Sequence, residues 1–102
     1  MTSIATQGHV SADEWVDAYF VSYSRDDIVW TYVRDDVGLA YEFTGNNDRR
    51  SVVQHQLTPP LTARYVRLHV LTYHGAPSLR WDVTGCDYGM FKRHLHMTIS
   101  TK

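Results

Sequence analysis

Six histidines are the first candidates for chemistry in this sequence, because a neutral imidazole binds metals and exchanges protons near neutral pH. His94 and His96 lie two residues apart, so on a strand both side chains would face the same side and could hold an ion. No cysteine, carboxylate or third histidine accompanies them at the spacing of a zinc site. The sequence therefore predicts no metal site and no cofactor.

The carboxylates and hydroxyls do not predict catalysis either. Asp13 and Glu14 are adjacent, whereas a glycosidase needs two carboxylates opposed across the bond that it cleaves. No nucleophile–base signature, phosphate-binding glycine loop or redox motif occurs. The run GNND at 45–48 lacks the spacing of a calcium loop, and turn formation by Asn and Asp side chains explains it better. We therefore expect a protein that is not an enzyme.

The only cysteine, Cys86, follows the last strand-like segment. An odd cysteine count points either to a partner outside the chain or to a free thiol. A buried free thiol is an equally good explanation on residue statistics alone, because unpaired cysteines are often buried. Both alternatives stay open from the residues alone.

Seven short segments must position these residues, and all of them have the character of strands. They are rich in β-branched and aromatic residues, they often alternate, and turn residues separate them. In the segment 15–24, Trp15, Tyr19, Val21 and Tyr23 share one face, with Asp17 as the exception. No helix is predicted, and the pattern indicates a β-sandwich or barrel. The predicted strands cover residues 4–7, 15–24, 28–34, 39–43, 51–57, 63–72 and 79–85.

Charge and hydropathy exclude several classes of protein. Ten basic residues against 11 acidic ones, with no concentrated basic face in the body, argue against a nucleic-acid partner. No apolar run approaches the ~18–20 residues of a membrane helix. The first residues lack the basic start and apolar core of a signal peptide, so an export signal, if there is one, is expected outside this chain.

Several runs of residues also follow the order and spacing of a known family. They are IATQG at 4–8, WV at 15–16 with Tyr19, Val21, Tyr23 and Ser24, WT at 30–31, FTGN at 43–46 with Asp48, PP at 59–60, ARYVRL at 63–68, LR at 79–80 and GC at 85–86. On these runs the chain resembles the discoidin domain, also called the coagulation factor V/VIII type C domain. Asp27, Tyr73 and Asp82 stand where that family usually has Gly, Trp and Glu.

The resemblance implies an all-β fold: a jelly-roll-like antiparallel β-sandwich, similar to galactose-binding domains and N-terminally incomplete. Residues 1–86 would form the C-terminal two-thirds of the domain, and residues 87–102 a tail or linker. In the family the cysteine aligned with Cys86 forms a disulfide with one at the start of the domain, which this chain lacks. The missing opening strands would leave a sheet edge unpaired, so we expect an unstable fragment or self-association through that edge.

The resemblance also implies a ligand site on two loops at one end of the sandwich, since rigid sheets support recognition loops. Tyr73 could offer a stacking face, although core packing is the favoured alternative for it. Arg80 is expected to satisfy a carboxylate at the base of the site rather than to touch the ligand. The first loop would contribute His9, Val10, Ser11, Asp13 and Glu14, and the second Tyr73, His74, Gly75 and Ala76, leading into Arg80.

These expectations favour a non-catalytic extracellular or secreted module that binds a glycan or a protein surface in adhesion or matrix contact. One alternative is a peripheral phospholipid binder, but only Val10 and Ala12 are apolar in the first loop, and Asp13 and Glu14 would be repelled by anionic lipid. Another is a carbohydrate-targeting appendage of a secreted enzyme. Fold alone does not decide among them.

Overall fold

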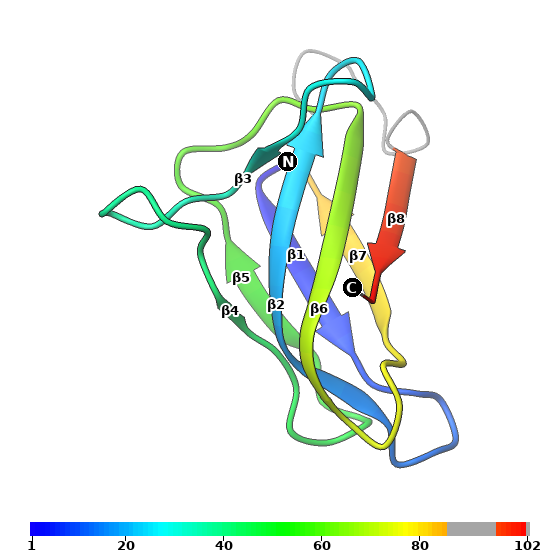
Figure 1. Cartoon of the computed structure of the whole chain (residues 1–102). Helices are drawn as coiled ribbons and strands as arrows, with labels where there is room; N and C mark the ends of the chain where they lie inside the picture. The colour runs from blue at the N-terminus through cyan, green and yellow to red at the C-terminus, as the bar shows by residue number, and fades with distance from the viewer. Residues whose placement is uncertain (86–95, 102) are drawn as a thin grey trace.

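The chain folds into two facing β-sheets (Figure 1). The computed structural model describes residues 1–85 and 96–101. One sheet has three strands in the order β5-β1-β7, and the other has the order β3-β2-β6-β8, with β4 also paired to β2. The predicted all-β sandwich is confirmed. The strands are β1 (Ser3–Gln7), β2 (Trp15–Ser24), β3 (Thr31–Tyr32), β4 (Phe43–Thr44), β5 (Val53–Gln56), β6 (Tyr65–His74), β7 (Arg80–Thr84) and β8 (His96–Ser100).

The core lies between the sheets, where alternate residues of the two longest strands point inward. β2 and β6 run antiparallel, and their register places Val21 beside Leu68 and Tyr19 beside Val70. Ile4 and Val83 close the core from the other sheet, and both are almost completely buried. Burying each such side chain contributes about 1.5–3 kcal/mol. This alternation packs the two sheets face to face and leaves the connecting loops at the two ends of the sandwich.

The prediction that Trp15 shares a face with Tyr19 and Val21 is wrong. The register of β2 shifts between Val16 and Ala18 and again between Ala18 and Tyr19, which is a β-bulge. An extra residue reverses the side on which all earlier side chains lie. Val16 is therefore the fully buried residue, while Trp15 is turned out of the core and only half-buried.

The strands predicted at 28–34 and 39–43 shrink to two residues each, because aspartate side chains hold the neighbouring backbone in turns. Asp26 Oδ1 accepts hydrogen bonds from the amides of Ile28 and Val29, at 2.9 and 3.0 Å. Those amides are then not available for a strand ladder. Asp27, where the family usually has Gly, adopts a left-handed backbone with φ 64°, a conformation that Asp tolerates better than most residues.

The interpretation of residues 87–102 as a tail or linker does not describe its last part. His96–Ser100 forms β8, which pairs in parallel with β6 and places His96 beside Tyr65. The rings of those two residues stack with centroids 4.9 Å apart. The domain boundary itself remains a prediction. Cys86 and His94 lie outside the described residues.

Candidate functional site

The two loops predicted to carry the site lie side by side at one end of the sandwich, at the bottom of Figure 1. Trp15 opens β2 and His74 closes β6, and the antiparallel register pairs these two residues. The loop before β2 (residues 8–14) must therefore meet the loop after β6 (residues 75–79). A carbonyl of the first loop confirms the contact, since a Cβ on Gly75 would lie 2.8 Å from the Asp13 carbonyl oxygen.

The first loop is held closed by its own histidine. His9 Nδ1 accepts hydrogen bonds from the amides of Ser11 and Ala12, both at 3.0 Å. The His9 amide donates to the Glu14 carbonyl at 2.8 Å, which closes the loop at its base. His9 therefore shapes the loop, and Val10, Ser11 and the Asp13 side chain stand exposed on it.

The second loop depends on a glycine and on a link to the first. Gly75 has φ 76°, a conformation that disfavours any residue with a Cβ. Ser78 Oγ donates to Glu14 Oε1 at 2.9 Å, so the Glu14 carboxylate joins the loops. The side chain of Ala76 is only half-exposed. The Ala76 amide donates to the His74 carbonyl, and the Ala76 carbonyl accepts from the Ser78 amide.

Three rings lie at the junction of the loops. Trp15 and His74 stack with centroids 4.2 Å apart and planes 11° from parallel. Tyr73 is 53% exposed, so the favoured expectation that it packs in the core is wrong. Tyr73 pairs with Val16 across the ladder, but Val16 is fully buried in the core, whereas Tyr73, the next-to-last residue of β6, is exposed. Its ring remains open to contact from outside.

Arg80 is bonded to backbone carbonyls rather than to a carboxylate, which corrects the expectation for it. Its Nε donates to the Gly8 carbonyl at 2.8 Å, and a terminal nitrogen donates to the Arg49 carbonyl at 3.3 Å. A guanidinium has several donors in one plane, so Arg80 ties the first loop to the segment after β4. It positions the site without occupying it.

Arg49 is the central residue that the sequence did not predict. Its guanidinium donates to the Val10 carbonyl at 3.0 Å and lies 3.5 Å from Asp13 Oδ1. It comes from the segment between β4 and β5, whose turn is formed by Asp48. Asp48 Oδ1 accepts the amides of Arg50 and Ser51 at 2.9 and 2.6 Å, which confirms turn formation. These bonds hold the pKa of Asp48 below its usual value.

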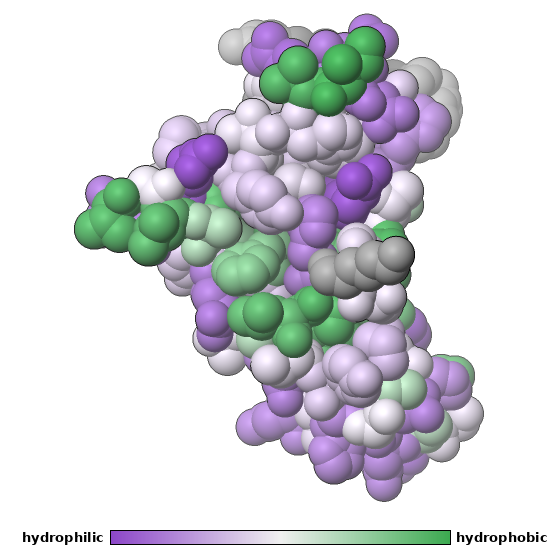
Figure 2. Space-filling model, in the orientation of Figure 1, coloured by the Kyte–Doolittle hydropathy of each residue, from purple (hydrophilic) through white to green (hydrophobic). Residues whose placement is uncertain are grey.

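A hollow of about 390 Å³ opens between this third loop and the start of β2, with Asp13 of the first loop beside it. One wall is aromatic and the others carry both signs of charge, which suits a ligand with an apolar face and several hydroxyls. Figure 2 shows a predominantly hydrophilic surface over this end of the molecule. The hollow is lined by Asp13, Trp15, Asp48, Arg49 and Arg50.

The acidic and imidazole groups do not gather into a metal centre. Across residues 1–85 and 96–101, no group of three or more His, Cys, Asp or Glu side chains is arranged to hold an ion. The same ranges contain no helix that could cross a lipid bilayer.

Comparison with known proteins agrees with this architecture. Retinoschisin from Takifugu rubripes is 40% identical over 87 residues, which is 84% of this chain and 31% of that protein. Discoidin-1 from Dictyostelium discoideum is 39% identical over 78% of this chain and 30% of that protein. The structure of discoidin II from the same organism matches with a TM-score of 0.69 at 33% identity, over 78% of this chain and 30% of that one.

The chain thus spans about a third of the length of these relatives. The model of the F5/8 type C domain matches residues 1–83, which is most of the chain. The resemblance to discoidin domains is confirmed, and the chain belongs to the F5/8 type C domain family.

Proposed function

We propose that this chain is a non-catalytic extracellular recognition module, and that it binds a glycan in the hollow beside Trp15. The observation that carries the proposal is the composition of that hollow. A half-buried indole stands next to Asp13, Arg49 and Asp48. Carboxylates accept from sugar hydroxyls and guanidinium groups donate to them, while the indole offers a flat apolar face to the sugar ring.

The rigidity of the three loops supports the proposal. His9 closes the first loop, Gly75 allows the second to approach it, and Asp48 forms the turn of the third. Arg49 and Arg80 then join the loops through backbone carbonyls. A site that is already ordered loses little conformational entropy on binding, so weak contacts with single hydroxyls can add up to recognition.

The surface favours a glycan over a phospholipid membrane. Among the residues that the structure describes at this end, Val10 is a large apolar side chain at a loop tip, 66% exposed, but it stands beside Asp13 and Glu14. Anionic lipid repels such carboxylates. A protein surface remains the other partner that polar loops of this kind can bind, and a glycan array separates the two.

The test is binding of the purified chain to a glycan array, compared with three variants. Trp15→Ala removes the stacking face, and we expect it to weaken binding by about tenfold or more, equivalent to ~1.4 kcal/mol. Asp13→Asn should also weaken binding without affecting folding, because its side chain is 83% exposed. Asp27→Asn, on the exposed loop at the opposite end of the sandwich, is the matched control and should bind like the wild type.

Two results would contradict the proposal. One is wild-type protein that is folded by circular dichroism and binds no glycan on the array. The other is a glycan bound equally well by the wild type and by Asp13→Asn and Trp15→Ala, since that glycan would be held elsewhere on the molecule.

A further inference from the structure

The apolar side chains that the molecule exposes are concentrated between β2 and β4, away from the glycan hollow. Six of the eleven large hydrophobic residues exposed in the described part of the chain fall between residues 28 and 41. Within that stretch residues 34–40 form a hairpin, closed by the bridge between Arg34 and Ala40. Figure 1 shows this hairpin projecting from the body on the left, between β3 and β4.

The hairpin is a rigid structure with an apolar tip. Asp35 Oδ1 accepts the amides of Val37 and Leu39 at 3.0 and 2.9 Å, and the Asp35 amide donates to the Leu39 carbonyl at 2.7 Å. Gly38, with φ 88°, completes the turn. Val37 and Leu39 are left 79% and 65% exposed, and Figure 2 shows the hydrophobic colour at this projecting tip.

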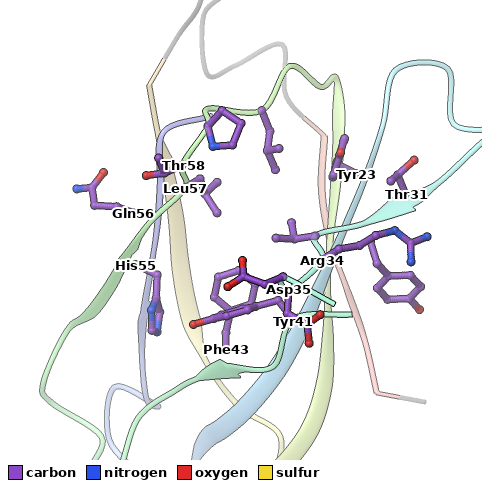
Figure 3. A pocket seen from close by; sticks show the side chains of 15 residues that line it. Tyr23, Thr31, Arg34, Asp35, Tyr41, Phe43, His55, Gln56, Leu57 and Thr58 are labelled. Atoms are coloured by element: carbon purple, nitrogen blue, oxygen red, sulfur yellow. The ribbon is translucent and has the colours of Figure 1, made fainter. Parts of the chain in front are cut away.

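A groove of about 540 Å³ lies at the foot of the same hairpin. It occupies the open side of the sandwich, between the edge strands of the two sheets, β4 and β5. Figure 3 shows Tyr41 and Phe43 on one side and His55 on the other, and the rings of Phe43 and His55 meet edge to face at 5.4 Å. The apolar part of the lining includes Val33, Tyr41, Phe43, Leu57, Pro59 and Leu61.

The tip is apolar and much of the groove lining is apolar, but the hairpin projects from the body of its own molecule. We propose that the groove receives the hairpin tip of a second copy of this chain, so that two copies exchange tips across a two-fold axis. A two-fold interface requires one patch that contains both complementary surfaces. The hairpin and the groove meet that requirement, because Arg34 and Asp35 belong to both.

Charge and rigidity support a second copy as the occupant. The rim carries exposed Arg34 and exposed Asp36, so a two-fold rotation brings a positive and a negative group of one copy against the opposite groups of the other. Arg34 donates one N–H to its own Gly38 carbonyl at 2.8 Å and has further donors to offer. Because Asp35 already orders the tip, association immobilises few new groups.

Sedimentation of the purified chain over a range of concentrations tests the proposal. Wild type is expected to form a dimer. The double variant Val37→Ser, Leu39→Ser should raise the dimer dissociation constant by about tenfold or more, with unchanged circular dichroism because both side chains are exposed. The matched control is Ile28→Ser, Val29→Ser, which removes the same kind of exposed apolar pair from the neighbouring loop and should dimerise like the wild type.

Cross-linking gives a readout that does not depend on affinity. In a Cys86→Ser background, copies carrying Leu39→Cys are mixed with copies carrying Gln56→Cys, which lies on the groove lining. A disulfide-linked heterodimer is expected from this mixture and not from Ile28→Cys mixed with Gln56→Cys. The proposal is overturned by a monomer at every concentration, by open-ended assembly, by a dimer indifferent to the tip variant, or by equal cross-linking in the control mixture.

Discussion

Single carboxylates decide the shape of three loops in this molecule. Asp26, Asp35 and Asp48 each accept backbone amides from residues that follow them in the chain. These hydrogen bonds hold the pKa of Asp26 and of Asp48 below the ordinary value. A carboxyl group with a lowered pKa supports the fold at neutral pH and loses that support only as the pH falls below about 4. The loops that follow Asp26 and Asp48 therefore keep their form across the physiological range.

Tyr19 is the residue at which a smaller side chain should help the fold. Its ring stacks on Phe43 at 5.2 Å, and the Thr6 side chain lies close to its buried hydroxyl, but the Thr6 hydroxyl donates to Asn46 and no group meets the phenol with good hydrogen-bonding geometry among the described residues. Burial strongly raises the pKa of this phenol. Tyr19→Phe should leave the free energy of unfolding unchanged or raise it by about 1 kcal/mol, since an unsatisfied buried hydroxyl is costly. Urea denaturation measures the change.

Tyr41→Phe is the matched control for that prediction, because Tyr41 is 42% exposed and its hydroxyl can reach water. Its free energy of unfolding should stay within experimental error of the wild type. A loss of more than about 1 kcal/mol in Tyr19→Phe would mean that the hydroxyl has a stabilising partner.

His69 should make stability depend on pH just below neutrality. Burial, and secondarily the charge of Arg67, lower the pKa of His69 below its ordinary value of 6.5, and Ser22 Oγ lies 2.7 Å from its Nε2. The unfolded chain then binds a proton more readily than the folded one, so stability falls as the pH drops below about 6.5. His69→Gln should flatten this dependence. Urea denaturation between pH 7.5 and 5 measures the free energy of unfolding of both proteins. An equal slope of that free energy against pH in the two proteins would refute the prediction.

The strand β4 depends on a glycine that no other residue can replace without moving the backbone. A Cβ on Gly45 would lie 2.4 Å from the Val16 carbonyl oxygen, at the β2 bulge. The amides of Gly45 and Asn46 donate to Asp17 and Val16 carbonyls, both at 2.9 Å. Gly45→Ala should cost about 1–3 kcal/mol and speed hydrogen exchange of the Asn46 amide.

Gly38→Ala separates this steric effect from the general cost of replacing a glycine. Nothing lies within 4 Å of a Cβ at Gly38. The Gly38→Ala substitution should therefore lower the free energy of unfolding by about 1–2 kcal/mol through the left-handed backbone alone. It should leave exchange of the Asn46 amide unchanged. Equal exchange of that amide in both variants would show that Gly45 does not set the pairing of β4 with β2.

The same elements show what a sequence can predict. The long strands β2 and β6 follow from alternation, and the meeting of the two loops follows from their antiparallel register. The bulge next to Val16 does not follow from the sequence pattern, because it depends on β4 and β6 pairing with opposite edges of β2. The role of Arg49 is not predictable for a related reason: it acts on residues about 40 positions away, and a contact of that kind leaves no periodicity in the chain.

At the scale of the whole molecule, the hydrophilic loop end and most of the exposed apolar residues are separate. The loops around Trp15 are hydrophilic, while the loop between β2 and β3, which carries the exposed residues Ile28 and Val29, lies at the opposite end, at the top of Figure 1, and the hairpin that carries Val37 and Leu39 projects at the side. Stable membrane binding needs apolar side chains inserted below the headgroups or attraction to anionic lipid. At the loop end around Trp15, the exposed Val10 stands beside Asp13 and Glu14, whose charges anionic lipid repels, and this predicts how the chain behaves toward vesicles.

Wild-type chain should therefore not sediment with phosphatidylserine vesicles, and apolar loop tips should convert it into a protein that does. Val10 and Ser11 are both exposed at the tip of the first loop, so Val10→Trp, Ser11→Leu adds two large side chains that can enter the interface without disturbing the core. The same pair of changes with Asp13→Asn should bind still more strongly, because it also removes a charge that anionic lipid repels. Vesicles of phosphatidylcholine alone control for charge. The opposite outcome is a wild type that sediments with phosphatidylserine vesicles. If Asp13→Arg then sediments with them to the same extent, the lipid contacts a different surface from the loop end.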